Sequence, residues 1–485
     1  MGLDARRLGP IGDLAAGESW EPDRLGREID RRVPVLRRLG ARPGARVVLA
    51  HGDRPAFFAD LLAAWRLGAC AVCVNPGVPE SELANICEFT EPAAVLTSVG
   101  SGCGAGLNRP VVALEDESAG GGAACGADGS LDDPALMLFT SGTTGDPKGV
   151  VHSFRSILTR IALNRVHIGD ATLARTLCVL PTRFGHGLIG NCLTPLLAGH
   201  SLFLGGGMGI EVARSLSTTI AEHDITFLSS VPSFWKMVLR LSGPPEPGVL
   251  RQVSVGSAPL SAELWNDIAE WAGTRNVVNM YGLTETASWF SGASAACHEP
   301  ESGLIGAPWG GVFGVLDAGG EGQEVRNTGE GELVVQTPSL MSGYFRRDDL
   351  TARAIAGGWY RSGDVGYLDG RGVARLTGRV KHEINRAGIK IHPEEIDVLL
   401  ERHESVQEAC AFGIPDDISG EVVGVAVQVR AGADLSLEAL RAWCRERMRV
   451  EATPVRWFRL NEIPKSGRGK VNRDAVRRAC LEPLS

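Results

Sequence analysis

The regular alternation of short apolar runs with amphipathic segments, from residue 44 to about residue 290, constrains the fold of this chain most strongly. Apolar runs such as Ala45–Ala50, Ala71–Val74 and Ser201–Leu204 predict strands, and segments such as Pro55–Leu67, Pro79–Glu88 and Gly187–Leu197 predict helices. Strands that are separated by helices of this length pair in parallel, and the helices cover both faces of the sheet. The sequence therefore predicts an α/β fold built on parallel sheets.

A different pattern begins near residue 301. Runs such as Gly331–Thr337 and Gly358–Gly370 alternate apolar and polar residues and break at glycine or Asp-Gly, which predicts antiparallel hairpins. Mixed helix and strand returns after Arg379, where Leu437–Met448 is predicted as a helix that Ser436 caps. We place a domain boundary at Val380–Lys381, so that the predicted domains are residues 1–379 and 380–485.

Composition excludes several classes of protein. The 485 residues suggest two or three domains, and a net charge of −8 gives no attraction to nucleic acid. No apolar run is long enough to span a membrane, and the N-terminus lacks the apolar core of a signal peptide. Cys70 and Cys73 form a lone CxxC pair inside an apolar run, which predicts buried, reduced thiols. We expect a cytoplasmic protein without nucleic-acid or membrane partners.

The segment Thr140–Gly149, TSGTTGDPKG, has the composition of a loop that binds a polyphosphate. Glycine allows the backbone to approach the phosphates, hydroxyl groups donate hydrogen bonds, and Lys148 offsets charge. Apolar runs on both sides predict strand, loop, strand. A triphosphatase P-loop has Gly-Lys-Ser/Thr at the start of a helix, whereas Pro147 and Gly149 flank Lys148 here. A flexible linker is disfavoured because its flanks would not both be apolar. The candidate phosphate ligands are Thr140, Ser141, Gly142, Thr143, Thr144, Gly145 and Lys148.

Five further segments follow in a characteristic order, and with this loop they resemble the adenylate-forming superfamily. The segments are Ser254–Ser261 (SVGSAPLS), Asn279–Ala287 (NMYGLTETA), Tyr360–Asp369, Leu376–Asp397 and Pro464–Arg473. The superfamily includes acyl- and aryl-CoA synthetases and the adenylation domains of nonribosomal peptide synthetases. The resemblance implies a large N-terminal domain of two stacked α/β subdomains with a small β-barrel, and a small mobile α+β C-terminal domain.

The resemblance also implies the reaction and its substrates. A carboxylate attacks the α-phosphate of ATP with Mg²⁺ bound, which gives acyl-AMP and pyrophosphate, and a thiol such as that of coenzyme A then takes the acyl group. Bringing two anions to about 4 Å costs on the order of 4 kcal/mol at an effective dielectric constant near 20, so cations and oriented donors must offset it. Lys470 matches the catalytic lysine, Thr284 the α-phosphate contact and Glu285 the magnesium ligand. Without this context, Thr284 would be read as a helix N-cap and Lys470 as a solvated charge.

The remaining roles follow from the same resemblance. Tyr281 is expected to stack on adenine. Asp364, otherwise readable as a hairpin-turn residue, and Arg379 are expected to bind the ribose. The small domain is expected to swing between an adenylating pose and a thioester-forming pose, and Lys381 matches the hinge of this movement. Gly388 matches the pantetheine tunnel, although Ala387 stands where many relatives have a first glycine. The wall opposite Tyr281 is expected to consist of Gly256, Ser257, Ala258 and Pro259.

The segment Pro181–Leu204 bears on the acid. It has Phe184 where many fatty-acyl relatives have histidine, and no Asp near His186 that would bind an α-ammonium group. The run from Phe184 to Leu188 is more similar to benzoate-type ligases, so we expect a small aromatic acid in a pocket formed by Phe184, His186 and Tyr281. His186 could instead face solvent at a helix start or make a satisfied polar contact. The thiol could belong to CoA or to a separate carrier protein, and the protein could be a monomer or a homodimer. A non-enzymatic nucleotide-binding role is disfavoured by Lys470.

Overall fold

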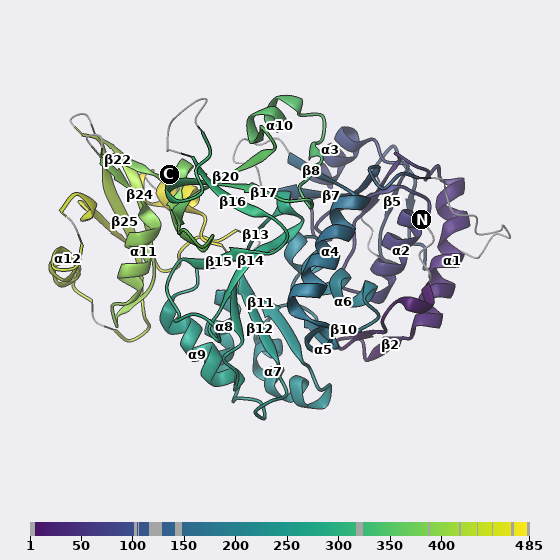
Figure 1. Cartoon of the computed structure of the whole chain (residues 1–485), viewed down its shortest axis with the longest axis horizontal. Helices are drawn as coiled ribbons and strands as arrows, with labels where there is room; N and C mark the ends of the chain where they lie inside the picture. The colour runs from purple at the N-terminus through teal and green to yellow at the C-terminus, as the bar shows by residue number, and fades with distance from the viewer. Residues whose placement is uncertain are drawn as a thin grey trace.

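The computed structural model describes residues 5–100, 104, 106–115, 129–140, 148–316, 324–386, 389–416, 419–433, 435–448, 450–466 and 470–482, except the side chains of residues 5, 140 and 390. In this part of the chain three sheets are present. Helices flank the two larger sheets, and the third belongs to a smaller α+β unit at the left of Figure 1.

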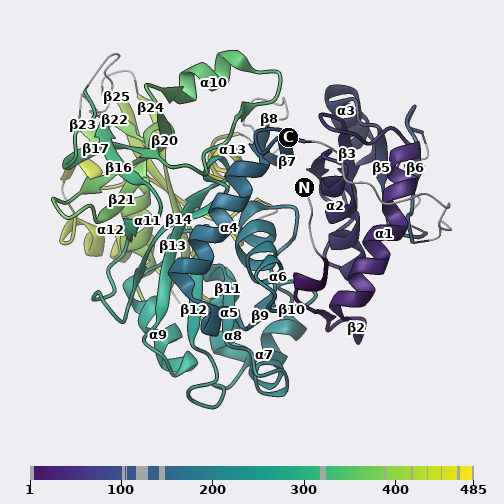
Figure 2. The ribbon, with the colours of Figure 1, turned by 45° about the vertical axis from the view of Figure 1, so that its right-hand side comes forward.

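The first sheet has the strand order β18-β8-β7-β4-β3-β5-β6. Strands β4, β3 and β5 pair in parallel, whereas β8 is antiparallel to both of its neighbours. Its strands are β3 (Arg46–Leu49), β4 (Cys70–Cys73), β5 (Ala94–Leu96), β6 (Val111–Val112), β7 (Pro134–Thr140), β8 (Lys148–Ser153) and β18 (Gly343–Tyr344). Three helices precede or connect them: α1 (Pro22–Arg38), α2 (Pro55–Arg66) and α3 (Glu80–Thr90). Figure 2 shows α1 and α2 side by side at the edge of the molecule.

The second sheet has the order β16-β17-β20-β21-β15-β14-β13-β12-β11-β9-β10-β1-β2, with β19 beside β20. Within this order, neighbouring strands from β13 to β1 pair in parallel, and the strands from β14 to β16 pair antiparallel with their neighbours. Its strands are β1 (Ile11–Asp13), β2 (Glu18–Trp20), β9 (Arg175–Cys178), β10 (Ser201–Leu204), β11 (Phe227–Ser230), β12 (Gln252–Gly256), β13 (Val277–Leu283), β14 (Ser288–Ser294), β15 (Leu304–Pro308), β16 (Val312–Leu316), β17 (Gly329–Gln336), β19 (Ile355–Ala356), β20 (Trp359–Leu368) and β21 (Ala374–Arg379). The helices in this part are α4 (Phe154–Ile168), α5 (Asp170–Leu173), a π-helix (His186–Leu193), α6 (Thr194–Leu197), α7 (Ile210–Glu222), α8 (Pro232–Leu241), α9 (Ala262–Ala272) and α10 (Asp348–Ala354).

The third sheet follows the turn Val380–His382 and has the order β23-β22-β25-β24, with β26 beside β25. Its strands are β22 (Ile384–Arg386), β23 (Ile389–Ile391), β24 (Val406–Asp416), β25 (Gly420–Val429) and β26 (Arg456–Arg459), and its helices are α11 (Pro393–Glu401), α12 (Leu437–Arg445) and α13 (Arg473–Leu481). None of the helices in the described part of the chain combines the length and apolar character that a membrane span requires.

The predicted fold class is confirmed. Parallel strands alternate with helices in both large sheets, and the antiparallel strands continue the second sheet through β14 and β15 around a core that includes Phe290 and Phe313. Ser436 caps α12 by accepting the Ala439 N–H at 3.4 Å. The domain boundary at Val380–Lys381 stays a prediction; the second sheet ends just before it, at Arg379.

Two features differ from the sequence analysis. The long helices α1 and α4 were not predicted, because they lie outside the segments in which the sequence pattern predicts helices. The helix predicted at Gly187–Leu197 begins as a π-helix, which places glycines against neighbouring chain. A Cβ at Gly187 would overlap the carbonyl of Pro181, and one at Gly190 would lie 2.8 Å from Ser288 Oγ.

The CxxC pair is buried as predicted. Cys70 and Cys73 lie in β4, have at most 2% of their surface exposed, and pack into different clusters on the two faces of the sheet. Burial raises the pKa of the Cys70 thiol to about 12, so it stays protonated. Both are free thiols, as are the other cysteines within the described residues.

Candidate active site

The glycine- and hydroxyl-rich loop connects two antiparallel strands. β7 ends at Thr140, β8 begins at Lys148, and these two residues face each other in the ladder. The predicted strand, loop, strand arrangement is thus confirmed, and a triphosphatase loop that opens a helix is excluded here. The phosphate contacts predicted for the loop lie outside the described residues and stay predictions; these residues are Ser141, Gly142, Thr143, Thr144 and Gly145.

The Thr284–Glu285 pair lies in a single 3₁₀ turn, Thr284–Thr286, at the end of β13. The hydroxyl of Thr286 accepts the N–H of Leu283 at 3.0 Å and so closes the turn. The capping role that a Thr-Glu pair often has therefore falls to Thr286 and not to Thr284. The α-phosphate contact of Thr284 stays a prediction.

Glu285 lies beside the strand that begins at Lys148. Its Oε1 accepts a hydrogen bond from the Tyr344 hydroxyl at 2.9 Å, and Tyr344 in β18 pairs with β8. Burial and the negative charge of Glu285 raise the pKa of Tyr344, so the phenol stays protonated and donates. Magnesium binds well to one carboxylate together with phosphate oxygens and waters. Since no basic side chain pairs with Glu285 in the described part of the chain, the site fits the predicted magnesium ligand.

A buried histidine forms a hydrogen bond with the same turn. His152 in β8 donates its Nε2–H to the carbonyl of Thr284 at 2.7 Å, and its Nδ1 lies 3.3 Å from Ser156 Oγ. Burial, with a smaller contribution from the positive charge of Arg160, lowers the pKa of His152 to about 4, although the hydrogen bond to Thr284 opposes this shift. The ring is therefore neutral at pH 7 in the folded protein.

The depressed pKa of His152 predicts a loss of stability in mild acid. A histidine with a pKa of 6.5 when unfolded and about 4 when folded contributes stability above pH 6.5, and this is lost as the pH falls toward 4. From this residue we expect a decrease of about 2 kcal/mol in the free energy of unfolding between pH 7 and pH 5. Urea denaturation of the wild type and of His152→Gln at both pH values measures it. An equal decrease in the free energy of unfolding between pH 7 and pH 5 in the two proteins would contradict the assignment to His152. The variant His298→Gln serves as the control.

Asp364 joins two other residues predicted to bind the nucleoside. Its Oδ2 accepts from the Tyr281 hydroxyl at 2.7 Å, and its Oδ1 lies 2.7 Å from Arg379 Nε. The three come from β13, β20 and β21, and Asp364 pairs with Arg379 in the ladder. The charge of Asp364 raises the pKa of Arg379, and burial followed by the same charge raises that of Tyr281. Asp364 is therefore held by two donors and is not a free turn residue.

His186, at the start of the π-helix, makes polar contacts with both ring nitrogens. Nδ1 lies 2.8 Å from Ser257 Oγ and Nε2 lies 2.7 Å from Ser229 Oγ. Its ring also meets the edge of Trp289, with centroids 5.6 Å apart. Burial lowers the pKa of His186 to about 3, with a further contribution from Lys470. His186 is half-buried, and the satisfied polar contact that was one alternative for it is present, while its contact with the acid stays a prediction.

The predicted wall Gly256–Pro259 follows the end of β12 and approaches His186. A Cβ at Gly256 would lie 2.9 Å from the carbonyl oxygen of Met280 and 3.6 Å from His186 Cε1, so only glycine fits without a shift. Ser257 has a φ of 68° and contacts His186, while Ala258 and Pro259 continue the turn. Their predicted contact with adenine stays a prediction.

The structure brings the C-terminal lysine to this region. The pKa of His186 responds to the charge of Lys470, so the two side chains lie within electrostatic reach although 284 residues of sequence separate them. The backbone N–H of Ser466 donates to the Lys470 carbonyl at 2.7 Å. Lys381 lies in the turn Val380–His382, and desolvation, then the charges of Arg379 and Lys148, lower its pKa. Gly388, predicted at the pantetheine tunnel, lies outside the described residues.

Phe184 lies two residues before His186, and Arg183 packs over the Phe184 ring at 4.7 Å. Tyr281 contacts Phe313 and Asp364, so the structure places it on the side of the predicted ribose contacts. Sequence reasoning missed His152, Tyr344 and Ser229, and it named Ser257 only as part of the wall opposite Tyr281. No local signal marks them, because they are ordinary strand residues until the sheets bring them together.

Comparison with protein families identifies the chain. A model described as "AMP-binding enzyme" matches residues 23–345, and "AMP-binding enzyme C-terminal domain" matches residues 395–470. The chain therefore belongs to the AMP-binding enzyme family. The expected membership of the adenylate-forming superfamily is thereby confirmed, as is the expected class of enzyme, an acyl- or aryl-CoA ligase.

Relatives differ in the acids and thiols that their names state. Oxalate–CoA ligase of Arabidopsis thaliana is 32% identical over 72% of this chain and 68% of its own length. Feruloyl-CoA synthase of Amycolatopsis sp and the fatty acid–[acyl-carrier-protein] ligase MmaC of Mycobacterium marinum are each 30% identical over 94% of this chain and 92% of their own length. Among solved structures, o-succinylbenzoate-CoA synthetase of Bacillus subtilis with its acyl-adenylate has a TM-score of 0.86 at 22% identity, covering 100% of this chain and 96% of that one.

Proposed function

We propose that this enzyme activates a small aromatic acid without a second charged group as its acyl-AMP and transfers the acyl group to coenzyme A. The observation that carries the choice of acid is the environment of His186. The ring is neutral, because its pKa is about 3, and both nitrogens are engaged by serine hydroxyls. A neutral imidazole beside the indole of Trp289 suits an aromatic ring and offers no cation to a second acidic group.

The proposed chemistry assigns one task to each group. The acid's carboxylate oxygen attacks the α-phosphorus of ATP, and pyrophosphate leaves toward the loop at Lys148. Thr284 and Lys470 stabilise the charge that develops at the α-phosphate, while Asp364 binds the ribose. When bound at Glu285, Mg²⁺ would neutralise phosphate charge. The CoA thiol then attacks the acyl carbon and AMP leaves.

ATP–pyrophosphate exchange with a panel of acids tests this function. We expect exchange with benzoate-type acids to exceed exchange with oxalate, sulfoacetate and straight-chain alkanoates by about tenfold or more, because a charged or flexible acid gains less from a neutral aromatic wall. Strong exchange with an alkanoate and none with any aryl acid would overturn the choice of acid. Absence of exchange with every acid would overturn the proposed activity itself.

A carrier protein is the second candidate for the thiol. It is supported by the ligase of Mycobacterium marinum, whose name states an acyl carrier protein and which matches along nearly the whole chain. Thioester formation from the preferred acid, measured with CoA and with several phosphopantetheinylated carrier proteins, separates the two. A carrier-protein thioester without acyl-CoA would replace CoA in the proposal.

A further inference from the structure

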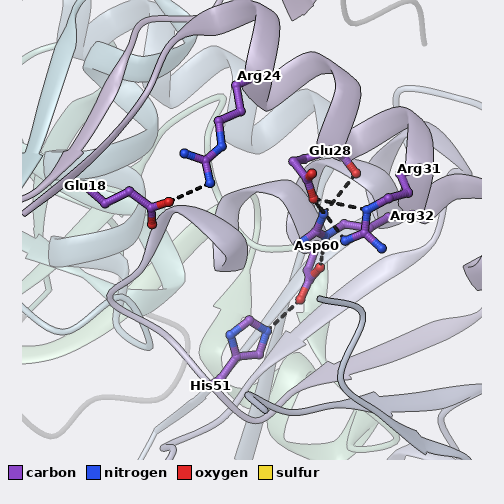
Figure 3. Close-up of polar contacts among 7 residues, drawn as sticks. All are labelled: Glu18, Arg24, Glu28, Arg31, Arg32, His51 and Asp60. Atoms are coloured by element: carbon purple, nitrogen blue, oxygen red, sulfur yellow. Dashed lines mark hydrogen bonds and ion pairs between the residues drawn. The ribbon is translucent and has the colours of Figure 1, made fainter. Parts of the chain in front are cut away.

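A buried ion cluster connects the first two long helices to the end of a central strand (Figure 3). Asp60 in α2 receives Arg32 of α1 on Oδ1 at 2.5 Å and His51 on Oδ2 at 2.8 Å. Arg32 also pairs with Glu28, and Arg31 of the same helix lies 3.0 Å from Glu28. Arg32 is fully buried and Asp60 is 2% exposed. A network of buried charges that contact one another in this way holds its members in defined positions.

The cluster ends two residues before a residue with unusual backbone geometry. His51 follows β3, and Asp53 then has a φ of 57°, a left-handed conformation that Asp and Asn adopt more readily than other non-glycine residues. Such conformations persist only where surrounding contacts determine them. Here the determining contacts come from a strand end of the other large sheet.

Asp53 and Thr182 exchange two hydrogen bonds. The N–H of Thr182 donates to Asp53 Oδ1 at 2.8 Å, and the N–H of Asp53 donates to Thr182 Oγ1 at 3.1 Å. Thr182 is 2% exposed and follows β9, so the pair joins strand ends from the two sheets. The packing is tight, because a Cβ at Gly52 would lie 2.5 Å from Thr182 Oγ1.

The segment held in this way leads directly into the proposed acid pocket. Arg183, which covers the ring of Phe184, feels the charge of Asp53, and so does Cys192 inside the π-helix that begins at His186. Asp53 thus faces the segment before the pocket wall and the helix after it. Among the described residues, none with a role in the proposed chemistry forms a hydrogen bond or ion pair with Asp53, so its influence would pass through Thr182.

We propose that Asp53 is a positioning residue for the acid: through Thr182 it sets the placement of Phe184 and His186, and the ion cluster behind His51 anchors it. The inference rests on the proposed function in taking Phe184 and His186 to contact the acid. A displacement of about 1 Å at a binding wall can reduce the rate by up to about 100-fold, so a hydrogen-bond pair outside the pocket can control the affinity for the acid.

Two substitutions at Asp53 distinguish the contribution of its carboxylate from that of its backbone conformation. Glycine accepts a positive φ but offers no acceptor to Thr182, whereas asparagine accepts the same φ and keeps Oδ1. We expect Asp53→Gly to raise the KM for the acid by about tenfold in pyrophosphate exchange, with the KM for ATP changed by less than about twofold. Asp53→Asn should recover most of the loss. Asp224→Gly is the matched control, because Asp224 is an exposed aspartate with a φ of 45° between α7 and β11.

Thr182→Val provides an independent variant should Asp53→Gly prove unstable. It removes Oγ1 while keeping the N–H and the shape, so we expect a smaller rise in the KM for the acid and, again, none for ATP. An unchanged KM for the acid in both variants, or equal increases for acid and ATP, would overturn the positioning role. These outcomes are measured with whichever acid the wild type uses, so they are distinct from failure of the proposed function, which appears as no exchange in the wild type.

Discussion

Lys470→Ala is expected to reduce acyl-adenylate formation by about 100- to 1,000-fold and to leave thioester formation from pre-made acyl-AMP within about twofold of the wild type. Lys470 lies within electrostatic reach of His186, which we propose as a wall of the acid pocket, and this supports the proposed role of its charge at the carboxylate and the α-phosphate. A group that stabilises charge only in the first transition state contributes nothing to the second half-reaction, whose attacking atom is a thiol sulfur.

Pyrophosphate exchange measures the first half-reaction, and CoA thioester yield from synthetic acyl-AMP measures the second. Lys465→Ala is the matched control, because Lys465 lies in the same segment but pairs with Glu408 at 2.8 Å. An equal decrease in both half-reactions would contradict the proposal that the small domain adopts separate poses around the hinge at Lys381. A bulky residue at Gly388, by the same proposal, should impair only thioester formation.

Asp364→Ala is expected to raise the KM for ATP by about 100-fold. The two ribose hydroxyls would each lose a hydrogen bond to a charged acceptor, which is worth about 1.5 kcal/mol apiece. The same change leaves the Tyr281 hydroxyl and the Arg379 guanidinium without the acceptor that both now use. We therefore also expect a lower melting temperature in the absence of nucleotide.

Tyr281→Phe and Asp369→Ala make this experiment specific. The first keeps the ring for adenine and removes only the hydroxyl that Asp364 accepts, so it should raise the KM for ATP far less than Asp364→Ala. The second removes a carboxylate from the same hairpin, where Asp369 accepts the N–H groups of Arg371 and Val373. It should lower stability without changing the KM for ATP. A wild-type KM for ATP in Asp364→Ala would contradict the ribose role.

Much of the fold was predictable because periodicity is a local property. The helix predicted at Pro55–Leu67 is observed at Pro55–Arg66, and the strand predicted at Ser201–Leu204 is observed with those bounds. The π-helix at His186 was not predictable, because Gly190 of this helix packs against Ser288 of β14, which lies far along the chain. Its position matters for function, because His186 begins it.

The sequence by itself determined the class of enzyme and predicted the identity of its reacting groups. Both depend on short motifs, whose side-chain chemistry can be interpreted from the sequence. Only the tertiary structure decided the state of those groups: that His186 is neutral between two serines, that Asp364 is already held by Tyr281 and Arg379, and that Asp53 reaches Thr182 in the turn after β9. The burial of a side chain and its hydrogen-bond partners depend on which strand ends lie next to each other, and residues far apart in the chain determine this arrangement.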